Sequence, residues 1–302
     1  MTPVTVIGGY LGAGKTTLIN HLLRHAGGRR LAVLVNEFGA LPIDEDLIEA
    51  RGEELIAIAG GCVCCAFGDN LIGALMDLSA LHPPPEQIVI EASGVAIPGS
   101  IAASVSLLMD FSLNGVVVLA DAETIRASAR DKYLGDTILR QLGDADLIVL
   151  SKADLVDGQL LHDVAGWLGD GVSAARIIPA RHGEVATDLL LGSSTNDSTA
   201  PPAAQGGHAD EAFESLVFAA DRPLDARSLA AELAGGSYGV IRAKGFVGDL
   251  SGERMLIQVV GKRAEVSPAR TDAPLGVVCI GLSGRLEEVA LRALFDAATV
   301  GS

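Results

Sequence analysis

A glycine-rich segment near the N-terminus combines a lysine and two threonines at a spacing suited to phosphate binding. It follows the apolar run Val4 to Ile7 and precedes leucines at helical spacing, so a strand is predicted before it and a helix after it. Glycines let the backbone curl until successive N–H groups point at phosphate oxygens, and the helix start adds its positive dipole end. We expect Lys15 to bridge the β- and γ-phosphates and act in catalysis, Thr16 to bind Mg²⁺ and Thr17 to reach the α-phosphate. The pattern predicts a nucleotide-binding P-loop with contacts at Gly9, Gly12, Ala13, Gly14, Lys15, Thr16 and Thr17.

A carboxylate at the end of a later strand is a second candidate for phosphate chemistry. The apolar run Ile88 to Ile90 leads into Glu91-Ala92-Ser93-Gly94. Glu91 is suited to hold the Mg²⁺ shell or to position the attacking water, and Gly94 lets the backbone meet the γ-phosphate. The structural alternative is a carboxylate that only caps the turn after the strand.

A third segment has the composition of a base-recognition loop. The apolar run Leu147 to Leu150 continues into Ser151-Lys152-Ala153-Asp154, which matches the guanine-reading element Asn-Lys-x-Asp except at its first position. The Asp154 carboxylate can accept from both the ring N–H and the exocyclic amino group of guanine, and the Lys152 stem can lie along the base. Ser151 lacks the amide that normally ties the loops together, so we expect weaker selectivity. The sequence predicts GTP and GDP as ligands, and the alternative role of Asp154 is a helix N-cap.

Three of the four cysteines lie within four residues, in Gly60-Gly61-Cys62-Val63-Cys64-Cys65. Thiolates suit Zn²⁺ and other soft or borderline ions, and three sulfurs leave one position of a tetrahedral site open. In an extended segment Cys62 and Cys64 project to one side and Cys65 to the other, so one ion can bind all three only if the chain bends at Cys64. The cluster predicts a transition-metal site, with redox switching and simple packing as alternatives. Cys279 lies in an apolar run and is expected in a core.

The composition limits the function classes. The chain has 302 residues, of which 49% are hydrophobic and 20% charged, and no apolar run reaches the ~18–20 residues that a membrane helix needs. Asp and Glu number 38 against 22 Lys and Arg, and the resulting formal charge of −16 would repel nucleic-acid phosphates. The N-terminus shows no basic region followed by an apolar stretch and a cleavage site. We therefore expect a cytoplasmic protein with neither membrane nor nucleic-acid partners.

Apolar runs alternate with helix-like segments over residues 1–192. This alternation predicts an α/β domain of the P-loop NTPase type, in which a mostly parallel sheet is flanked by helices. We expect one helix after Lys15 and another after a cap at Asp69. The predicted strands are Val4 to Ile7, Leu31 to Val35, Ile88 to Ile90, Val116 to Leu119, Leu147 to Leu150 and Ile177 to Pro179.

The rest of the chain has a different composition. Residues 193–211 are rich in Ser, Thr, Asn, Pro, Ala and Gly and predict a flexible linker. Residues 212–302 predict a small α+β domain with an antiparallel sheet and a helix over Ala226 to Leu233. The expected strands are Leu216 to Phe218, Val240 to Val247, Met255 to Val260 and Gly276 to Leu282. A last helix is expected to bury an apolar face made of Leu286, Val289, Ala290, Ala293 and Leu294.

The order of the motifs along the chain is itself informative. The motifs are Gly9 to Thr17, Asn36-Glu37-Phe38-Gly39, Asp44, Gly60 to Cys65, Glu91 to Gly94, Ser151 to Asp154 and His182-Gly183-Glu184. This set resembles the CobW family of metal-handling GTPases, and Leu216 to Phe295 resembles that family's C-terminal domain. The resemblance covers nearly the whole chain, and the cysteine motif between the switch elements makes it specific.

The resemblance implies slow GTP hydrolysis, with GTP or GDP and Mg²⁺ bound, tied to the transfer of Zn²⁺, Co²⁺ or a related ion to a client apo-metalloprotein or a cofactor pathway. It assigns Asn36 and Glu37 to a first switch, Glu91 to a second switch, and the metal site to Cys62, Cys64 and Cys65. One alternative is a GTPase module that senses metal or redox state and regulates a partner. A P-loop small-molecule kinase is a weaker alternative, because it explains neither Asp154 nor the thiols. The oligomeric state, monomer or homodimer, is left open.

Overall fold

The computed structural model describes residues 1–35, 48–51, 55–58, 62–66, 70–192, 212–220, 222–269 and 275–297. The chain divides into two compact units, Met1–Thr187 and Asp188–Ser302. The predicted linker, residues 193–211, lies outside the described residues. No helix in the described part of the chain is long and apolar enough to cross a membrane.

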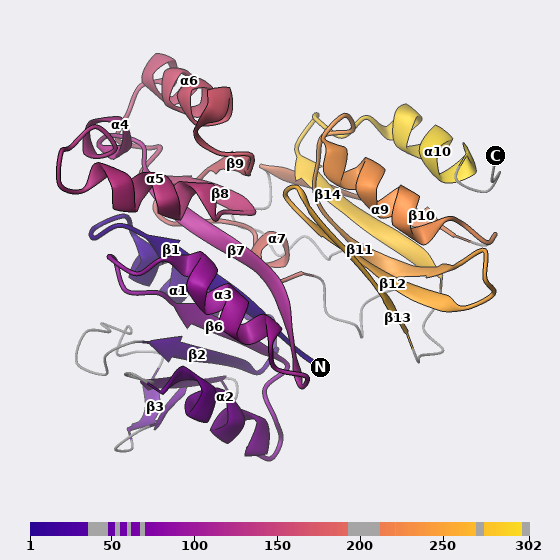
Figure 1. The fold of residues 1–302 in the computed structure, drawn as a ribbon, viewed down its shortest axis with the longest axis horizontal. Helices are drawn as coiled ribbons and strands as arrows, with labels where there is room; N and C mark the ends of the chain where they lie inside the picture. Colours follow the sequence, from indigo (N-terminus) through magenta and orange to yellow (C-terminus); the bar gives the residue numbers. More distant parts are fainter. Residues whose placement is uncertain are drawn as a thin grey trace. The chain divides into compact units, whose positions relative to one another are not determined.

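Nine strands form one sheet in the first unit, in the order β3-β4-β5-β2-β6-β1-β7-β8-β9 (Figure 1). In the spatial order of the sheet, every pair of neighbouring strands between β5 and β9 is parallel, whereas β4 pairs antiparallel with both β3 and β5. The prediction of a mostly parallel sheet is therefore confirmed, and it includes every strand predicted in this unit. The strands are β1 (Thr2–Gly9), β2 (Leu31–Val35), β3 (Ile48–Arg51), β4 (Leu55–Ile58), β5 (Cys62–Ala66), β6 (Gln87–Glu91), β7 (Phe111–Asp121), β8 (Leu147–Ser151) and β9 (Arg176–Pro179).

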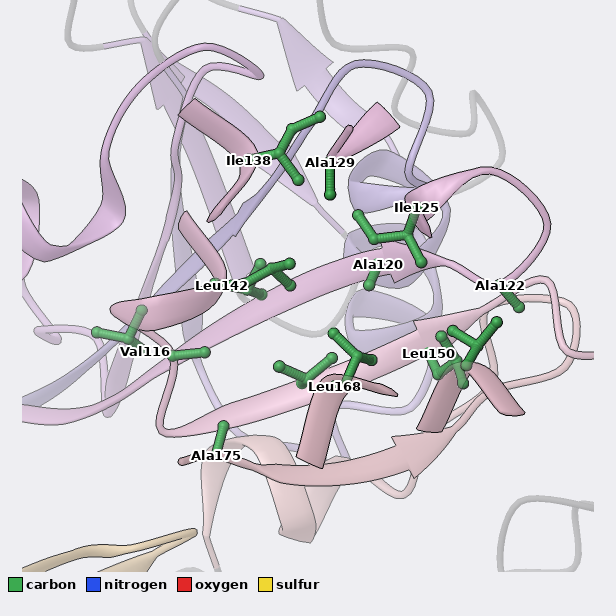
Figure 2. Packing of buried hydrophobic residues seen from close by; sticks show 14 of the residues in the cluster. Val116, Ala120, Ala122, Ile125, Ala129, Ile138, Leu142, Leu150, Leu168 and Ala175 are labelled. Atoms are coloured by element: carbon green, nitrogen blue, oxygen red, sulfur yellow. The ribbon is translucent and has the colours of Figure 1, made fainter. Parts of the chain in front are cut away.

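Both faces of the central strands are buried, which is why these strands occur as continuous apolar runs in the sequence. On one face, Val116, Ala120 and Leu150 of the strands pack with Ile138 and Leu142 of one helix (Figure 2). Helix α1 contacts β1. The helices are α1 (Lys15–Arg24), α2 (Leu71–Ala80), α3 (Pro98–Ser106), α4 (Ile125–Ser128), α5 (Gly135–Gly143), α6 (Gly158–Trp167) and α7 (Thr187–Leu191).

The start of α2 differs from the predicted one. Its N-cap is Asn70, whose side-chain oxygen accepts from the backbone N–H of Gly73 at 2.9 Å. Asp69, the predicted cap, lies outside the described residues. Both residue types cap helices well, so the sequence alone could not choose between adjacent positions.

The second unit contains a five-stranded antiparallel sheet in the order β10-β14-β11-β12-β13. Its elements are β10 (Phe213–Ala219), α9 (Ala226–Gly235), β11 (Val240–Gly248), β12 (Arg254–Val260), β13 (Arg263–Pro268), β14 (Gly276–Leu282) and α10 (Glu288–Ala297). The sequence analysis missed β13, which lies at an edge of the sheet, because its charged residues and terminal proline are typical of edge strands rather than of a buried run. Cys279 on β14 is buried, as expected, and burial raises the pKa of its thiol to about 12.

The predicted apolar face of the last helix is confirmed only in part, because Leu286 and Leu294 pack on the core of this unit whereas Val289, Ala290 and Ala293 are exposed. In α10, Leu291 and Phe295 are buried and Phe295 stacks on Phe218 at a centroid distance of 4.8 Å, whereas Val289 is 84% exposed. Two apolar stripes run along this helix, one rich in alanine and one carrying the larger side chains. The sheet selects the second stripe, because larger side chains remove more apolar area from water.

Candidate functional site

The P-loop leaves β1 at the carboxyl edge of the sheet, where β6 and β7 flank this strand. Gly9, Gly12 and Gly14 have φ values of 132°, 77° and 95°, in the region that favours glycine. Space also excludes a side chain at Gly9, since a Cβ there would lie 2.6 Å from the carbonyl oxygen of Leu119. Gly14 is the N-cap of α1, so the helix begins at Lys15 and its free N–H groups face the loop. This is the backbone form that a phosphate cradle requires.

Lys15 folds back over the loop that precedes it. Its Nζ donates to the carbonyl oxygens of Gly9 at 2.9 Å and Tyr10 at 3.3 Å, and the residue is 8% exposed. Burial lowers the pKa of Lys15, and the charge of Glu91 acts in the opposite direction. Phosphate oxygens would be stronger acceptors for this ammonium group than neutral carbonyls. Thr16 and Thr17 occupy the first turn of α1, where Thr16 is half-buried and Thr17 exposed.

Glu91 ends β6 in the middle of the sheet. Its Cα pairs with Ile7 of β1 on one side and with Val35 of β2 on the other. Its Oε2 is buried and accepts no hydrogen bond from the described residues. Burial raises the pKa of Glu91, and the charge of Lys15 opposes the shift. A half-buried carboxylate with a free oxygen beside a phosphate loop suits the coordination shell of Mg²⁺ or the orientation of a water molecule.

The loop after Glu91 lies directly against the P-loop. A Cβ on Gly94 would lie 3.0 Å from the backbone nitrogen of Leu11, so only glycine allows this approach. On β1, Gly8 lies against the start of α3, because a Cβ there would collide with the ring of Pro98. Glycine at position 94 thus allows the loop after Glu91 to approach the P-loop.

Ser151 ties two loops although it lacks the usual amide. The weaker selectivity expected from the loss of that amide stays a prediction. The Ser151 hydroxyl lies 2.8 Å from the carbonyl oxygen of Ala13 in the P-loop and 3.2 Å from that of Ala120 on β7, and it can donate to either. The shorter contact replaces the missing amide with a buried hydroxyl.

The structure also settles the alternative role of Asp154. The N-cap of α6 is Asp157, so Asp154 is not the cap. Its Oδ1 accepts from the backbone N–H of His182 at 2.9 Å, and this hydrogen bond holds the pKa of Asp154 below its usual range. Lys152 has a φ of 55°, and its Nζ forms a 2.6 Å ion pair with Asp121. An ionised Asp154 is the form that accepts two hydrogen bonds from guanine.

His182 and Asp121 are site residues for which the sequence analysis gave no role. His182 and the following Gly183 have φ values of 53° and 77°. Gly183 lies so close to α1 that a Cβ on it would be 2.7 Å from Cγ2 of Thr17. The turn therefore links Asp154, the predicted base-recognition residue, to α1. The motif His182-Gly183-Glu184 was a visible signal, but its contact partners are far away in the sequence.

The cysteine motif forms β5, an unbroken strand from Cys62 to Ala66. It pairs in parallel with β2 and antiparallel with β4, and neither register shifts within β5. Strand geometry puts positions 62 and 64 on one face and position 65 on the other. The bend at Cys64 that a three-thiolate site requires is thus absent from this conformation of β5.

Two further predictions concern the first switch and the metal site. Asn36 and Glu37, the expected first switch, lie outside the described residues. Among the side chains that the structure describes, which exclude those of β5, no group of three or more His, Cys, Asp or Glu could hold a metal ion.

Loss of the Ser151 hydroxyl should weaken nucleotide binding. We expect Ser151→Ala to lower GDP affinity about tenfold, the effect of one buried hydrogen bond worth about 1–1.5 kcal/mol. Titration with a fluorescent GDP analogue measures this change. Ser104→Ala is the control, because within the described part of the chain that exposed hydroxyl bonds only to the carbonyl oxygen of Ser100 in its own helix, at 3.0 Å. Equal affinity of Ser151→Ala and wild type would contradict the role of this tie.

Removal of the Glu91 charge should stabilise the nucleotide-free protein. The pKa of Glu91 is raised, so its ionisation is less favourable in the folded state, and stability falls as the pH rises through the range in which it ionises. In EDTA, we expect Glu91→Gln to melt at a higher temperature than wild type at neutral pH. The difference should disappear below about pH 4.3, the ordinary value for Glu, where folded and unfolded states are both protonated. Glu123→Gln, an exposed position, is the control for calorimetry, and a less stable Glu91→Gln at neutral pH would contradict the argument.

Family models match both units of the chain. Residues 3–179 match the model described as CobW/HypB/UreG, nucleotide-binding domain, and residues 213–299 match the cobalamin synthesis protein cobW C-terminal domain. The first model alone covers more than half of the chain.

Characterised relatives extend this similarity over the full length. A Sinorhizobium protein named zinc chaperone CobW is 31% identical, with 98% of this chain and 96% of the relative covered. A Schizosaccharomyces pombe protein named zinc-regulated GTPase metalloprotein activator 1 is 33% identical over 65% of this chain and 51% of its own length. The crystal structure of Zn(II)-bound YjiA GTPase from E. coli superposes with a TM-score of 0.53 at 27% identity and covers 98% of each chain. With its P-loop and with family models that match both units, this chain belongs to the CobW family.

Proposed function

We propose that this protein is a GTP-hydrolysing metallochaperone or metal insertase. In this proposal, GTP binding and hydrolysis control the binding of a transition metal, Zn²⁺ or Co²⁺, and its transfer to a client apo-metalloprotein. The observation that carries the proposal is a backbone ladder in the central sheet. Cys65 on β5 pairs with Leu34 on β2, and Leu34 pairs with Ile90, the residue before Glu91.

This ladder provides a mechanical route between nucleotide and metal. β2 lies between the cysteine strand and the strand that ends in Glu91, so a shift of either neighbour acts on the same strand. Packed sheets shift between discrete arrangements rather than deform continuously. A change at the γ-phosphate that moves the end of β6 would therefore reach β5 through hydrogen-bonded neighbours.

The nucleotide half of the proposed mechanism would use the P-loop, the first turn of α1 and Glu91. Lys15 would exchange its carbonyl acceptors for the β- and γ-phosphate oxygens, with Gly9, Gly12, Ala13, Gly14 and Thr17 completing the cradle. Thr16 and Glu91 would hold Mg²⁺, and the buried free oxygen of Glu91 fits this role. When bound, Mg²⁺ neutralises charge that develops on the phosphates. We expect slow turnover, because Lys15 and Glu91 are the main catalytic side chains.

Guanine selectivity is assigned to the segment Ser151 to Asp154. Asp154 is ionised and oriented by His182, Lys152 is anchored on Asp121, and Ser151 connects this segment to the P-loop. Gly94 would meet the γ-phosphate from the opposite side, since it already contacts the P-loop at Leu11.

Metal binding by Cys62, Cys64 and Cys65 then requires β5 to change. In an unbroken strand position 65 does not share a face with positions 62 and 64, so a three-thiolate site needs part of the pairing with β2 or β4 to open. We propose that nucleotide state controls this opening.

Replacement of the base-reading carboxylate should change which purine binds. We expect Asp154→Asn to lose affinity for GDP and to gain affinity for xanthosine diphosphate, because the amide can donate to the xanthine carbonyl where the carboxylate could only accept. Asp157→Asn is a matched control three residues away, since asparagine also caps helices well. Competition titrations with GDP, xanthosine diphosphate and ADP measure the change. Equal affinity of wild type for guanine and adenine nucleotides would contradict the guanine assignment.

Metal affinity should depend on the nucleotide. Competition with a chromogenic chelator would be measured for the empty, GDP-bound and GTP-analogue-bound protein, with an expected difference of ~5–150-fold, or ~1–3 kcal/mol. Cys64→Ala should abolish tight binding, whereas Cys279→Ala, in the core of the second unit, should not. Equal affinity in all three states would rule out a nucleotide-gated chaperone. A change in partner binding without an increase in the metal content of an apo-client would instead favour a sensor.

A further inference from the structure

One buried side chain outside the P-loop holds the loop that follows Glu91. Gln141 on α5 is 2% exposed, and its Nε2 donates to the carbonyl oxygens of Gly94 at 3.0 Å and Ala96 at 2.7 Å. We propose that Gln141 is a positioning residue for hydrolysis, which fixes the loop from Glu91 to Ala96 relative to the sheet. This inference rests on the proposed function, because it assumes that this loop meets the γ-phosphate.

The identity of the amide atom is determined by its surroundings. Both neighbours are backbone carbonyl oxygens, which only accept, so the atom between them must be the NH₂ group. Both of its N–H bonds are then used on one loop. The contacts are shielded from water. In such a buried environment hydrogen bonds are stronger than in water, and a carbonyl oxygen without a partner is unfavourable. Glutamine and asparagine are the residue types whose neutral side-chain nitrogen carries two donor hydrogens, and asparagine is shorter by one methylene group.

Other contacts hold the same loop from different directions. The backbone N–H of Ala92 donates to the carbonyl oxygen of Ile7 on β1 at 2.9 Å. Gly94 lies against the backbone of Leu11, on the P-loop. Farther on, the backbone N–H of Gly99 donates to the carboxylate of Asp144, the residue that follows α5, at 2.9 Å. Gln141 supplies the described side-chain bonds to the segment between Ala92 and Gly99, and these bonds orient the peptide planes after Gly94 and Ala96.

Helix α5 provides a fixed reference for this loop. Ile138 and Leu142 of α5 are buried among side chains of β7 and β8, as Figure 2 shows. The chain then continues through Asp146, which accepts from the N–H of Val116 at 2.9 Å, into β8 and Ser151. The loop that meets the γ-phosphate is thus bonded to α5, and the segment that reads the base follows β8, on which α5 packs. If the loop moves, two buried hydrogen bonds must break or α5 must move with it.

The test replaces Gln141 with residues of similar shape that cannot donate two hydrogen bonds. Gln141→Glu puts carboxylate oxygens against two carbonyl oxygens, and Gln141→Met is neutral and apolar. Single-turnover GTP hydrolysis should become about 10- to 100-fold slower in both variants, because the reacting geometry is lost. GDP affinity should stay within about threefold of wild type, because the phosphate cradle and the base-reading segment are not changed. Gln159→Glu on α6 is the control, since that exposed amide bonds only to Asp163 among the described residues.

The pH profile separates positioning from general damage. In Gln141→Glu, protonation restores one O–H donor, so the rate relative to wild type should rise as the pH is lowered from about 8 to about 6. Gln141→Met should show no such recovery. Unchanged hydrolysis in both variants, or a loss of GDP affinity as large as the loss of rate, would overturn the proposal. If Gln141→Glu does not fold, the Met variant still gives the rate and the affinity.

Hydrogen exchange tests the two hydrogen bonds from Gln141 to the loop after Glu91, called the clamp below, without measuring hydrolysis. The amides from Ala92 to Ile97 should exchange faster in both Gln141 variants than in wild type, while amides of the control variant should not change. A wild-type protein that hydrolyses no GTP would refute the proposed function, and faster exchange would still support the clamp in that case. Unchanged exchange in this loop would refute the clamp, whatever the rate of hydrolysis.

Discussion

The parallel pairing of β1 with β6 is the constraint on which the site depends. It puts Ile7 opposite Glu91, and the loops that leave the two strands therefore meet at one edge of the sheet. Lys15, which is buried, and Glu91, which is half-buried, meet there although they are far apart in the sequence, and burial makes each charge less favourable while their attraction compensates only in part. A site of this kind has unused binding capacity: an ammonium bonded to neutral carbonyls and a carboxylate oxygen with no partner among the described residues. Anionic phosphate together with a cation would satisfy both groups.

Side chains from distant elements give the surrounding loops their conformations. Ser151 binds a P-loop carbonyl, Gln141 binds two carbonyls of the loop after Glu91, and the backbone of His182 binds Asp154. Each contact joins a side chain to a backbone group in another segment, so the loops are set by the sheet and its helices rather than by their own sequence. Loops anchored in this way can present ligand groups with the accuracy that phosphoryl transfer needs.

The cysteine strand shows how a stable sheet can serve a changeable site. In β5 the backbone is fully committed to ladders with β2 and β4, an arrangement that gives stability but keeps positions 62 and 65 on opposite faces. A three-thiolate site would therefore compete with strand pairing. In the proposed function, this competition would make the metal site responsive to the neighbouring strands, since a site that was complete in every conformation would bind metal without regard to nucleotide.

The sequence by itself determined the local features. The P-loop, the strand before Glu91 and most strands were predictable, because glycine spacing and apolar periodicity are properties of contiguous residues. Three features depended on tertiary structure: the hydroxyl of Ser151 as a substitute for an amide, the role of Gln141, and the choice of the Leu291–Phe295 stripe over the alanine-rich one in α10. The edge strand β13 belongs with them, because its pairing partner and not its composition makes it a strand. The physical reason is common to all four: each depends on which groups face one another after folding, and that is set by contacts between residues distant in the chain.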